Sequence, residues 1–279
     1  MAAQERKIDL QDIKNGGLSD TELPLFRALD SALNSADAVE SSAAEAASSI
    51  CGFLPASAST DDVEEFLWTF WGLLIQVSRA VPHDHAGQQI LVNIVKDLHG
   101  KDPAATVKIW AAKTSLWKDL PLLGPCMREA WFDPTSKVQS LDAKANQEWV
   151  NQNSFASRLF GARLTSWPIL GLWQLRASLE EPGSGPALDS RVSATCEWVV
   201  HAGRLLLGEC RADAALDQAE ARAQRPGSLY EGKAGFNMDR WGFWKRRFAE
   251  LGAEDGINAE VKDLARSATE TMEALEAGT

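Results

Sequence analysis

The stretch DDVEEFLWTFWGLLIQVSRAV, residues 61–81, decides the fold class of this chain. Its apolar side chains recur at spacings of three and four residues, which is the period of one helix face. They are Val63, Phe66, Leu67, Phe70, Trp71, Leu74 and Ile75. Residues 83–99 repeat the pattern and end before Gly100. We therefore expect two long helices that form an antiparallel hairpin across Pro82.

The same periodicity extends over most of the chain. The further segments that favour helix are one after Ser19 and residues 35–54, 142–164, 168–181, 189–210, 212–223, 237–251 and 258–277. No segment shows convincing strand alternation, and the proline-containing residues 102–125 suggest a long loop that holds short helices. The sequence predicts an all-α fold of about nine helices. We expect a flexible N-terminal arm over residues 1–18 and a single helical domain over residues 19–279.

Aromatic composition is the most unusual feature of the sequence. The chain has 11 tryptophans and one tyrosine in 279 residues. Tryptophan is large and apolar, and its indole N–H needs an acceptor when it is buried. Such a chain has either an unusually aromatic core or a cavity lined with indole faces. We expect a central apolar cavity with tryptophan walls.

Charge and motif content exclude several classes of function. The net charge of −11 argues against nucleic acid or an anionic membrane as a partner. No apolar segment is long enough to span a bilayer, no secretory signal is visible, and the four cysteines lack CxxC spacing. We expect a cytoplasmic protein with reduced thiols. Nucleotide-binding, serine-hydrolase and zinc-protease motifs are missing, so no cofactor or metal is expected, and the oligomeric state cannot be read.

Four segments carry a resemblance to a known family. They are Trp131-Phe-Asp-Pro-Thr135, Trp149-Val-Asn-Gln-Asn-Ser-Phe-Ala-Ser-Arg-Leu159, Leu172-Trp-Gln-Leu-Arg176 and Trp241-Gly-Phe-Trp-Lys-Arg-Arg-Phe248. Over roughly residues 60–250 the chain resembles a helical family of filamentous fungi that is catalogued as a domain of unknown function. Members of such families are often encoded beside natural-product pathways, and some pathway proteins act as cofactor-free cyclases. The resemblance therefore implies a role in natural-product biosynthesis.

Polar residues interrupt an apolar face in residues 142–164. Gln152 and Asn153 lie at helical spacing with Trp149 and Phe160. A buried amide without a partner costs a few kcal/mol, so these side chains need hydrogen bonds to protein, water or ligand. Either they hold neighbouring segments together, or they orient a ligand carbonyl or hydroxyl in an aromatic pocket.

A second polar stripe lies in residues 189–210. Glu197 and His201 are four residues apart, close enough to act as an acid–base pair, although such a stripe is also typical of a solvated helix face. We take Asn153, Gln152, His201 and Glu197 as candidate catalytic residues. The candidate substrate-binding walls are Trp131, Trp149, Phe160, Trp198 and Trp241.

Two acidic clusters match the spacing of a class I terpene cyclase. Asp61, Asp62 and Glu65 form a DDxxE pattern, and the second cluster follows the pattern (N/D)xxxSxxxE. The second cluster consists of Asp189, Ser193 and Glu197. In those enzymes the clusters bind Mg²⁺ around a diphosphate. The alternative is structural, because Asp61 and Asp62 favour the start of a helix and Asp189 suits an N-cap.

Basic residues gather near the C-terminal tryptophans. Arg240, Lys245, Arg246 and Arg247 could bind phosphate, but a basic outer face of an amphipathic helix also explains them. We expect a hydrophobic small-molecule substrate, a terpenoid or polyketide intermediate, which the protein cyclises or isomerises without a cofactor. A Mg²⁺-dependent cyclase and a non-catalytic helical interaction module remain as alternatives.

Overall fold

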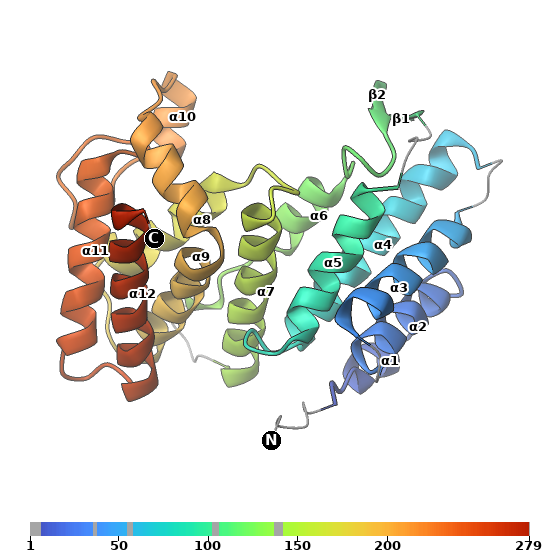
Figure 1. The fold of residues 1–279 in the computed structure, drawn as a ribbon, viewed down its shortest axis with the longest axis horizontal. Coiled ribbons are helices and arrows are strands. Elements are labelled where there is room, and N and C mark those ends of the chain that lie inside the picture. The colour runs from blue at the N-terminus through green and yellow to red at the C-terminus, as the bar shows by residue number, and fades with distance from the viewer. Residues whose placement is uncertain (1–6, 36–37, 55–57, 102–105, 137–141, 279) are drawn as a thin grey trace. The chain divides into compact units, whose positions relative to one another are not determined.

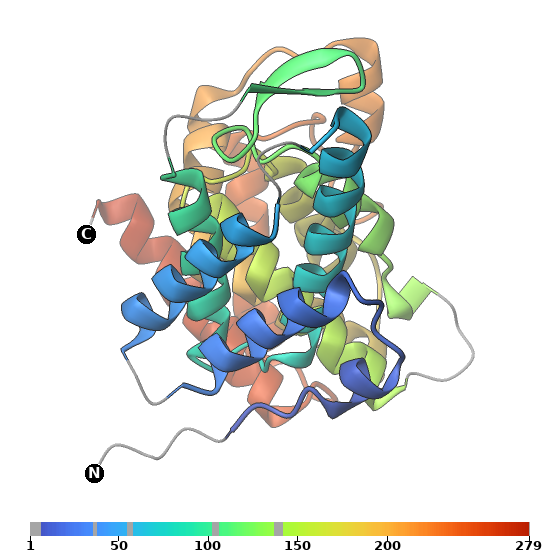
Figure 2. The same ribbon diagram turned by 90° about the vertical axis from the view of Figure 1, so that its right-hand side faces the viewer.

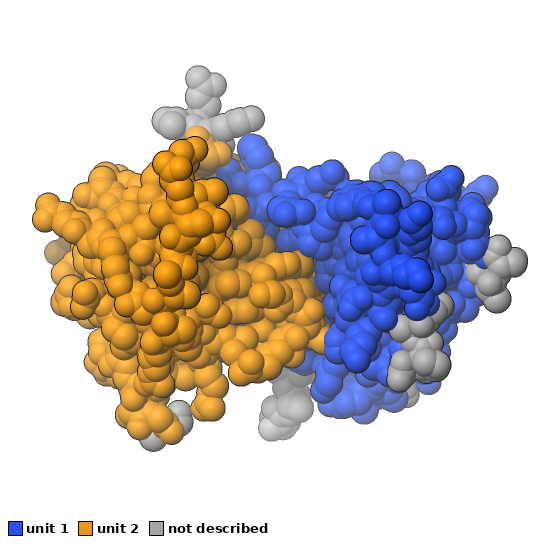
Figure 3. Space-filling model, turned by 90° about the horizontal axis from the view of Figure 1, so that it is seen from above, with its two compact units in different colours: residues 1–133 blue, residues 134–279 orange. Residues whose placement is uncertain are grey.

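A computed structural model describes residues 7–35, 38–54, 58–101, 106–136 and 142–278. Helices make up 69% of the chain, so the all-α fold class is confirmed. The described residues form 12 α-helices and one small sheet (Figure 1). The chain divides into two compact units, residues 1–133 and residues 134–279 (Figure 3). The single domain expected over residues 19–279 stays a prediction.

Unit 1 contains the helix that decides the fold class. Its helices are α1 (Gln11–Asn15), α2 (Glu22–Leu33), α3 (Val39–Phe53), α4 (Thr60–Ala80), α5 (Gly87–His99) and α6 (Leu123–Ala130). The periodicity of residues 61–81 thus places α4 to within one residue at each end. However, α5 packs mainly on α3, and α4 packs mainly on α6 and α2. The close pairing expected between α4 and α5 is therefore only a minor contact.

The first described residues pack within unit 1. Ile8, Leu10 and Ile13 are buried, and Gln11–Asn15 is helical. The Asn34 side chain accepts a hydrogen bond from the Ile8 amide at 3.0 Å and donates one to the Ile8 carbonyl at 3.2 Å. These bonds fix Ile8 to the end of α2. Ile8 lies in residues 1–18, where the sequence suggests a flexible arm.

A β-hairpin lies where we expected only loop and short helices. Strands β1 (Thr106–Ile109) and β2 (Ala112–Ser115) pair antiparallel, with Thr106 opposite Ser115; the hairpin is green in Figure 2. Its turn residues, Trp110 and Ala111, have φ of 48° and 67°. Two-residue hairpin turns with positive φ usually carry Asn-Gly or Asp-Gly. The Trp-Ala turn lacks that signature, so no local pattern predicts the hairpin.

Two tryptophans of unit 1, Trp71 and Trp117, form part of a packed aromatic core. Trp71 and Trp117 meet edge to face with ring centroids 6.3 Å apart, and Phe70 lies 4.5 Å from Trp71. The Trp71 indole N–H donates to the Pro121 carbonyl at 2.8 Å, so its polar atom is satisfied in the core. Aromatic packing thus accounts for these indoles.

Unit 2 is built around one long helix. Its α-helices are α7 (Ala143–Gly161), α8 (Pro168–Leu175), α9 (Gly185–Ala212), α10 (Gln218–Ala223), α11 (Met238–Ala253) and α12 (Ala259–Ala277). A 3₁₀ turn (Pro134–Ser136) precedes them, and a π-helical segment (Arg176–Glu180) extends α8. Helix α9 packs against α7, α8, α11 and α12 (Figure 1). Helix α7 approaches α9 closely at Gly161, where a Cβ would overlap the His201 carbonyl oxygen.

Candidate functional site

Asn153 is hydrogen-bonded within the α7–α9 packing. Its Oδ1 accepts from the Trp198 indole N–H at 2.8 Å, and its Nδ2 donates to the Trp149 carbonyl at 2.9 Å. Asn153 and Trp198 are both fully buried. This geometry supports the structural alternative for Asn153, because its acceptor already serves another side chain. Gln152 is also buried, and the catalytic roles of both amides stay predictions.

The aromatic residues expected as substrate walls are distributed over both units. Trp131 follows α6 and is half-buried, whereas the other four lie in unit 2 and are buried. The Phe160 and Trp198 rings lie 6.3 Å apart, and the Trp241 indole N–H donates to Glu276 of α12 at 2.8 Å. A hollow of about 200 Å³ in unit 2 is lined by residues that include Ile169, Leu216 and Phe236 and by none of these five. The central cavity stays a prediction.

Glu197 and His201 meet as the sequence predicts. Glu197 Oε2 lies 3.2 Å from His201 Nε2, and their side chains are 9% and 19% exposed. Arg158 of α7 lies near this pair: burial lowers the pKa of its guanidinium, and the Glu197 carboxylate raises it. Ser154 accepts a hydrogen bond from Arg158 Nε at 3.2 Å. An imidazole, a carboxylate and a guanidinium thus gather where α7 meets α9.

The acidic clusters have structural roles that the sequence also allowed. Ser59 and Asp62 form a reciprocal capping box at the start of α4, and the hydrogen bond from the Ser59 hydroxyl is the largest cause of a lowered Asp62 pKa. Asp61 and Glu65 lie on the same first turns, in unit 1. Asp189, in contrast, is not an N-cap: α9 begins earlier, and Asp189 Oδ1 accepts from the Asn258 amide at 3.3 Å.

The second acidic cluster also forms local bonds on α9. Ser193 donates to the Asp189 carbonyl at 2.9 Å, whereas Glu197 contacts His201. Among the residues that the structure describes, no group of three or more His, Cys, Asp or Glu side chains is placed to hold a metal ion. The Mg²⁺-dependent alternative stays a prediction without a supporting observation.

The cysteines of the core are poor nucleophiles. Burial raises the pKa of the Cys126 and Cys210 thiols to about 12, and it also raises the pKa of Cys196. The thiolate is the reactive form, so these side chains stay protonated near neutral pH. They act as small apolar residues of the core.

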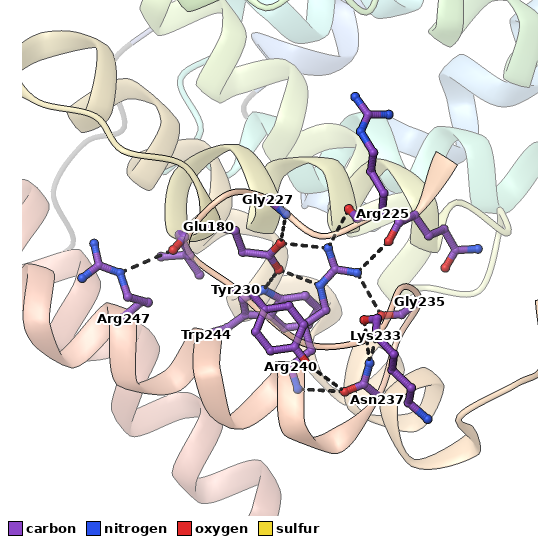
Figure 4. Close-up of polar contacts among 12 residues, drawn as sticks. Glu180, Arg225, Gly227, Tyr230, Lys233, Gly235, Asn237, Arg240, Trp244 and Arg247 are labelled. Atoms are coloured by element: carbon purple, nitrogen blue, oxygen red, sulfur yellow. Dashed lines mark hydrogen bonds and ion pairs between the residues drawn. The ribbon is translucent and has the colours of Figure 1, made fainter. Parts of the chain in front are cut away.

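Unit 2 also contains a buried polar cluster that the sequence did not predict. Arg240 was expected on a basic outer face, yet it is fully buried and pairs with Glu180, which ends the π-helical segment (Figure 4). Arg240 Nε donates to Glu180 Oε1 at 2.6 Å and Nη2 to Oε2 at 2.9 Å. The remaining guanidinium N–H groups reach the carbonyls of Gln224, Arg225 and Gly235.

Glu180 is as fully bonded as its partner. It also accepts from the Trp244 indole N–H at 2.6 Å and from the Gly227 amide at 2.7 Å. A Cβ at Gly227 would lie 2.6 Å from the Glu180 carbonyl, so only glycine allows this approach. The sequence contained one sign of the cluster: Arg240 shares a helical stripe with Trp244, Phe248 and Leu251, which are all buried.

Breaking this ion pair should destabilise the protein strongly. We expect Arg240→Leu or Glu180→Leu to cost about 3–5 kcal/mol in free energy of unfolding, because each leaves a buried charge without its partner. The double variant Glu180→Leu/Arg240→Leu should cost less than the sum. Urea unfolding measures both, with exposed Arg246→Leu as the matched control. A loss below about 1 kcal/mol in the single variants, as for a surface pair, would contradict this account.

The Asn153–Trp198 hydrogen bond should be measurable as a coupling. Asn153→Ala leaves the Trp198 indole N–H buried without its acceptor, which should cost about 1–3 kcal/mol of stability. In the background of Trp198→Phe, which has no N–H, the same substitution should cost less. A double-mutant cycle by chemical unfolding gives the difference. Strict additivity of the two substitutions would show that the bond contributes nothing.

None of the helices in the described part of the chain combines the length and apolarity that a bilayer crossing needs. No curated protein and no solved structure matches the chain. A family model with the description "Protein of unknown function (DUF3632)" matches residues 71–248, which include the Glu197–His201 pair and the Glu180–Arg240 cluster. This agrees with the resemblance over residues 60–250, and the chain belongs to the DUF3632 family.

Proposed function

We propose that unit 2 carries an acid–base site built on Glu197 and His201, and that the protein cyclises or isomerises a hydrophobic small molecule there without a cofactor. The observation that carries this proposal is the 3.2 Å contact between Glu197 Oε2 and His201 Nε2. A carboxylate that bonds one ring nitrogen fixes the orientation of the imidazole. The other nitrogen, Nδ1, has no hydrogen-bond partner in the described residues.

Each side chain has a distinct role in this proposal. His201 Nδ1 exchanges a proton with the substrate, and Glu197 is a positioning residue that stabilises the imidazolium. The partial exposure of His201 gives a substrate access, while the burial of Glu197 strengthens its interaction with the ring. Arg158 stands near Glu197 and balances its charge when the proton leaves.

Apolar surface beside His201 supports a hydrophobic substrate. Val200, the preceding residue of α9, is 52% exposed, and the buried rings of Phe160 and Trp198 lie 6.3 Å apart in the same unit. The substrate class, a terpenoid or polyketide intermediate, extends the implication of the resemblance and rests on no contact in the structure. A conversion that only rearranges bonds needs proton transfer and orientation, which these residues can supply.

Variants of the pair test the proposal. A panel of olefinic terpenoid and polyketide compounds is incubated with the protein, binding is followed by tryptophan fluorescence, and mass-neutral conversion is followed by chromatography with mass detection. His201→Gln should lower kcat at least about 10²-fold, the usual contribution of a general acid or base, with little change in Tm. Glu197→Gln should lower kcat less and shift its pH profile.

The control for this experiment is Glu209→Gln, an exposed carboxylate on the same helix. It should leave kcat and Tm unchanged. Unchanged activity per folded molecule in His201→Gln would show that the pair is only a helix surface contact. A panel without any binding or conversion by the wild-type protein would also contradict the proposal.

A further inference from the structure

The guanidinium group of Arg176 is bonded to no described residue. It begins the π-helical segment of unit 2 and is half-buried. Its Nε is inaccessible to solvent and has no acceptor, and no hydrogen bond or ion pair joins its guanidinium to any described residue. A buried guanidinium N–H without an acceptor is costly, so this group requires an explanation.

Both neighbouring carboxylates are engaged elsewhere. Glu180 bonds Arg240, Trp244 and Gly227, as described above. Glu181 Oε2 accepts from the Ser228 hydroxyl at 2.8 Å and from the Ser228 amide at 3.3 Å. The acidic residues that follow Arg176 on the chain therefore stabilise the loop after α10 instead of pairing with Arg176.

A second guanidinium group, that of Arg225, is near enough to repel that of Arg176. Arg225 is exposed, and its side chain makes a single hydrogen bond, from Nη1 to the Arg222 carbonyl at 3.3 Å. Burial is the largest cause of a lowered Arg176 pKa and repulsion from Arg225 is the next, while the Glu181 and Glu180 carboxylates act in the opposite direction. Figure 4 shows the Arg225 side chain directed away from the Glu180–Arg240 pair.

The backbone around both arginines is held in place. The Arg225 carbonyl accepts from Arg240 Nη2 at 3.2 Å, and the Ala223 carbonyl accepts from the Trp173 indole N–H at 3.2 Å. Trp173 lies on α8, directly before the segment that carries Arg176. These bonds hold the backbone of the loop that carries Arg225 beside the segment that carries Arg176.

We propose that Arg176 and Arg225 form a binding site for a small oxyanion, either a phosphate or a carboxylate group. The planar, forked donors of arginine match the oxygen pairs of such anions, and one anion would supply the acceptor that Arg176 lacks and relieve the repulsion between the two charges. The site is independent of the acid–base pair proposed above. In a chain with net charge −11, it is a local concentration of positive charge.

Calorimetric titration tests this site. The full chain is titrated with inorganic phosphate and, separately, with succinate at constant ionic strength, so that the two arms distinguish a phosphate site from a carboxylate site. We expect saturable binding of at least one probe. Arg176→Gln and Arg225→Gln should each weaken it about tenfold or more, because each removes charged hydrogen bonds. Arg176→Lys should weaken it less than Arg176→Gln, since it keeps the charge but loses the fork.

The matched control is Arg246→Gln, an exposed arginine of α11. It should retain wild-type affinity, whereas an equal loss would show that only the general field of the surface attracts the anion. In buffer without either probe, Arg176→Gln should keep or raise Tm, because it removes an unpaired charge; a lower Tm would show a structural role instead. Absence of binding of both probes, or unchanged affinity in Arg176→Gln, would overturn the proposal.

Discussion

The buried contact between Glu180 and Arg240 is the interaction on which unit 2 depends. Taking two charges out of water is expensive, and only excellent geometry with further hydrogen bonds offsets that cost. Here both carboxylate oxygens face the guanidinium, and the other N–H groups of Arg240 reach three backbone carbonyls. One ion pair thus joins the end of the π-helical segment, the first turn of α11 and the loop between α10 and α11.

The Glu180–Arg240 pair also occupies a carboxylate that could otherwise pair with Arg176. Because Glu180 serves Arg240 and Glu181 serves Ser228, Arg176 keeps its charge without a protein acceptor. On α9, which packs against most of the other helices of the unit, Glu197 and His201 form a contact of a different kind, with a buried carboxylate and a partly exposed imidazole. Unit 2 therefore contains one structural ion pair, Glu180–Arg240, and two nitrogen atoms that make no hydrogen bond to the described residues. These are Arg176 Nε and His201 Nδ1.

Sequence periodicity predicted the helices well because α-helices are local structures with one buried face. Residues 61–81 became α4, and the Glu197–His201 contact followed from a spacing of four within one helix. The hairpin was missed because Trp110 and Ala111 replace the usual turn residues. The burial of Arg240 was missed because Glu180 is 60 residues away, and no local pattern reports such a pairing. The same limit applies to Asn153, whose acceptor is used by Trp198 on another helix.

Amide hydrogen exchange offers the most direct measurement of the central claim, that the ion pair holds the loop after α10. The Gly227 amide donates to the Glu180 carboxylate at 2.7 Å, and the Leu229 amide donates to the Glu180 carbonyl at 2.8 Å. If the pair fixes this loop, both amides exchange only through the opening that unfolds the core of unit 2, as slowly as the central amides of α9. Exchange of Gly227 and Leu229 at the rate of unprotected loop amides would contradict the account.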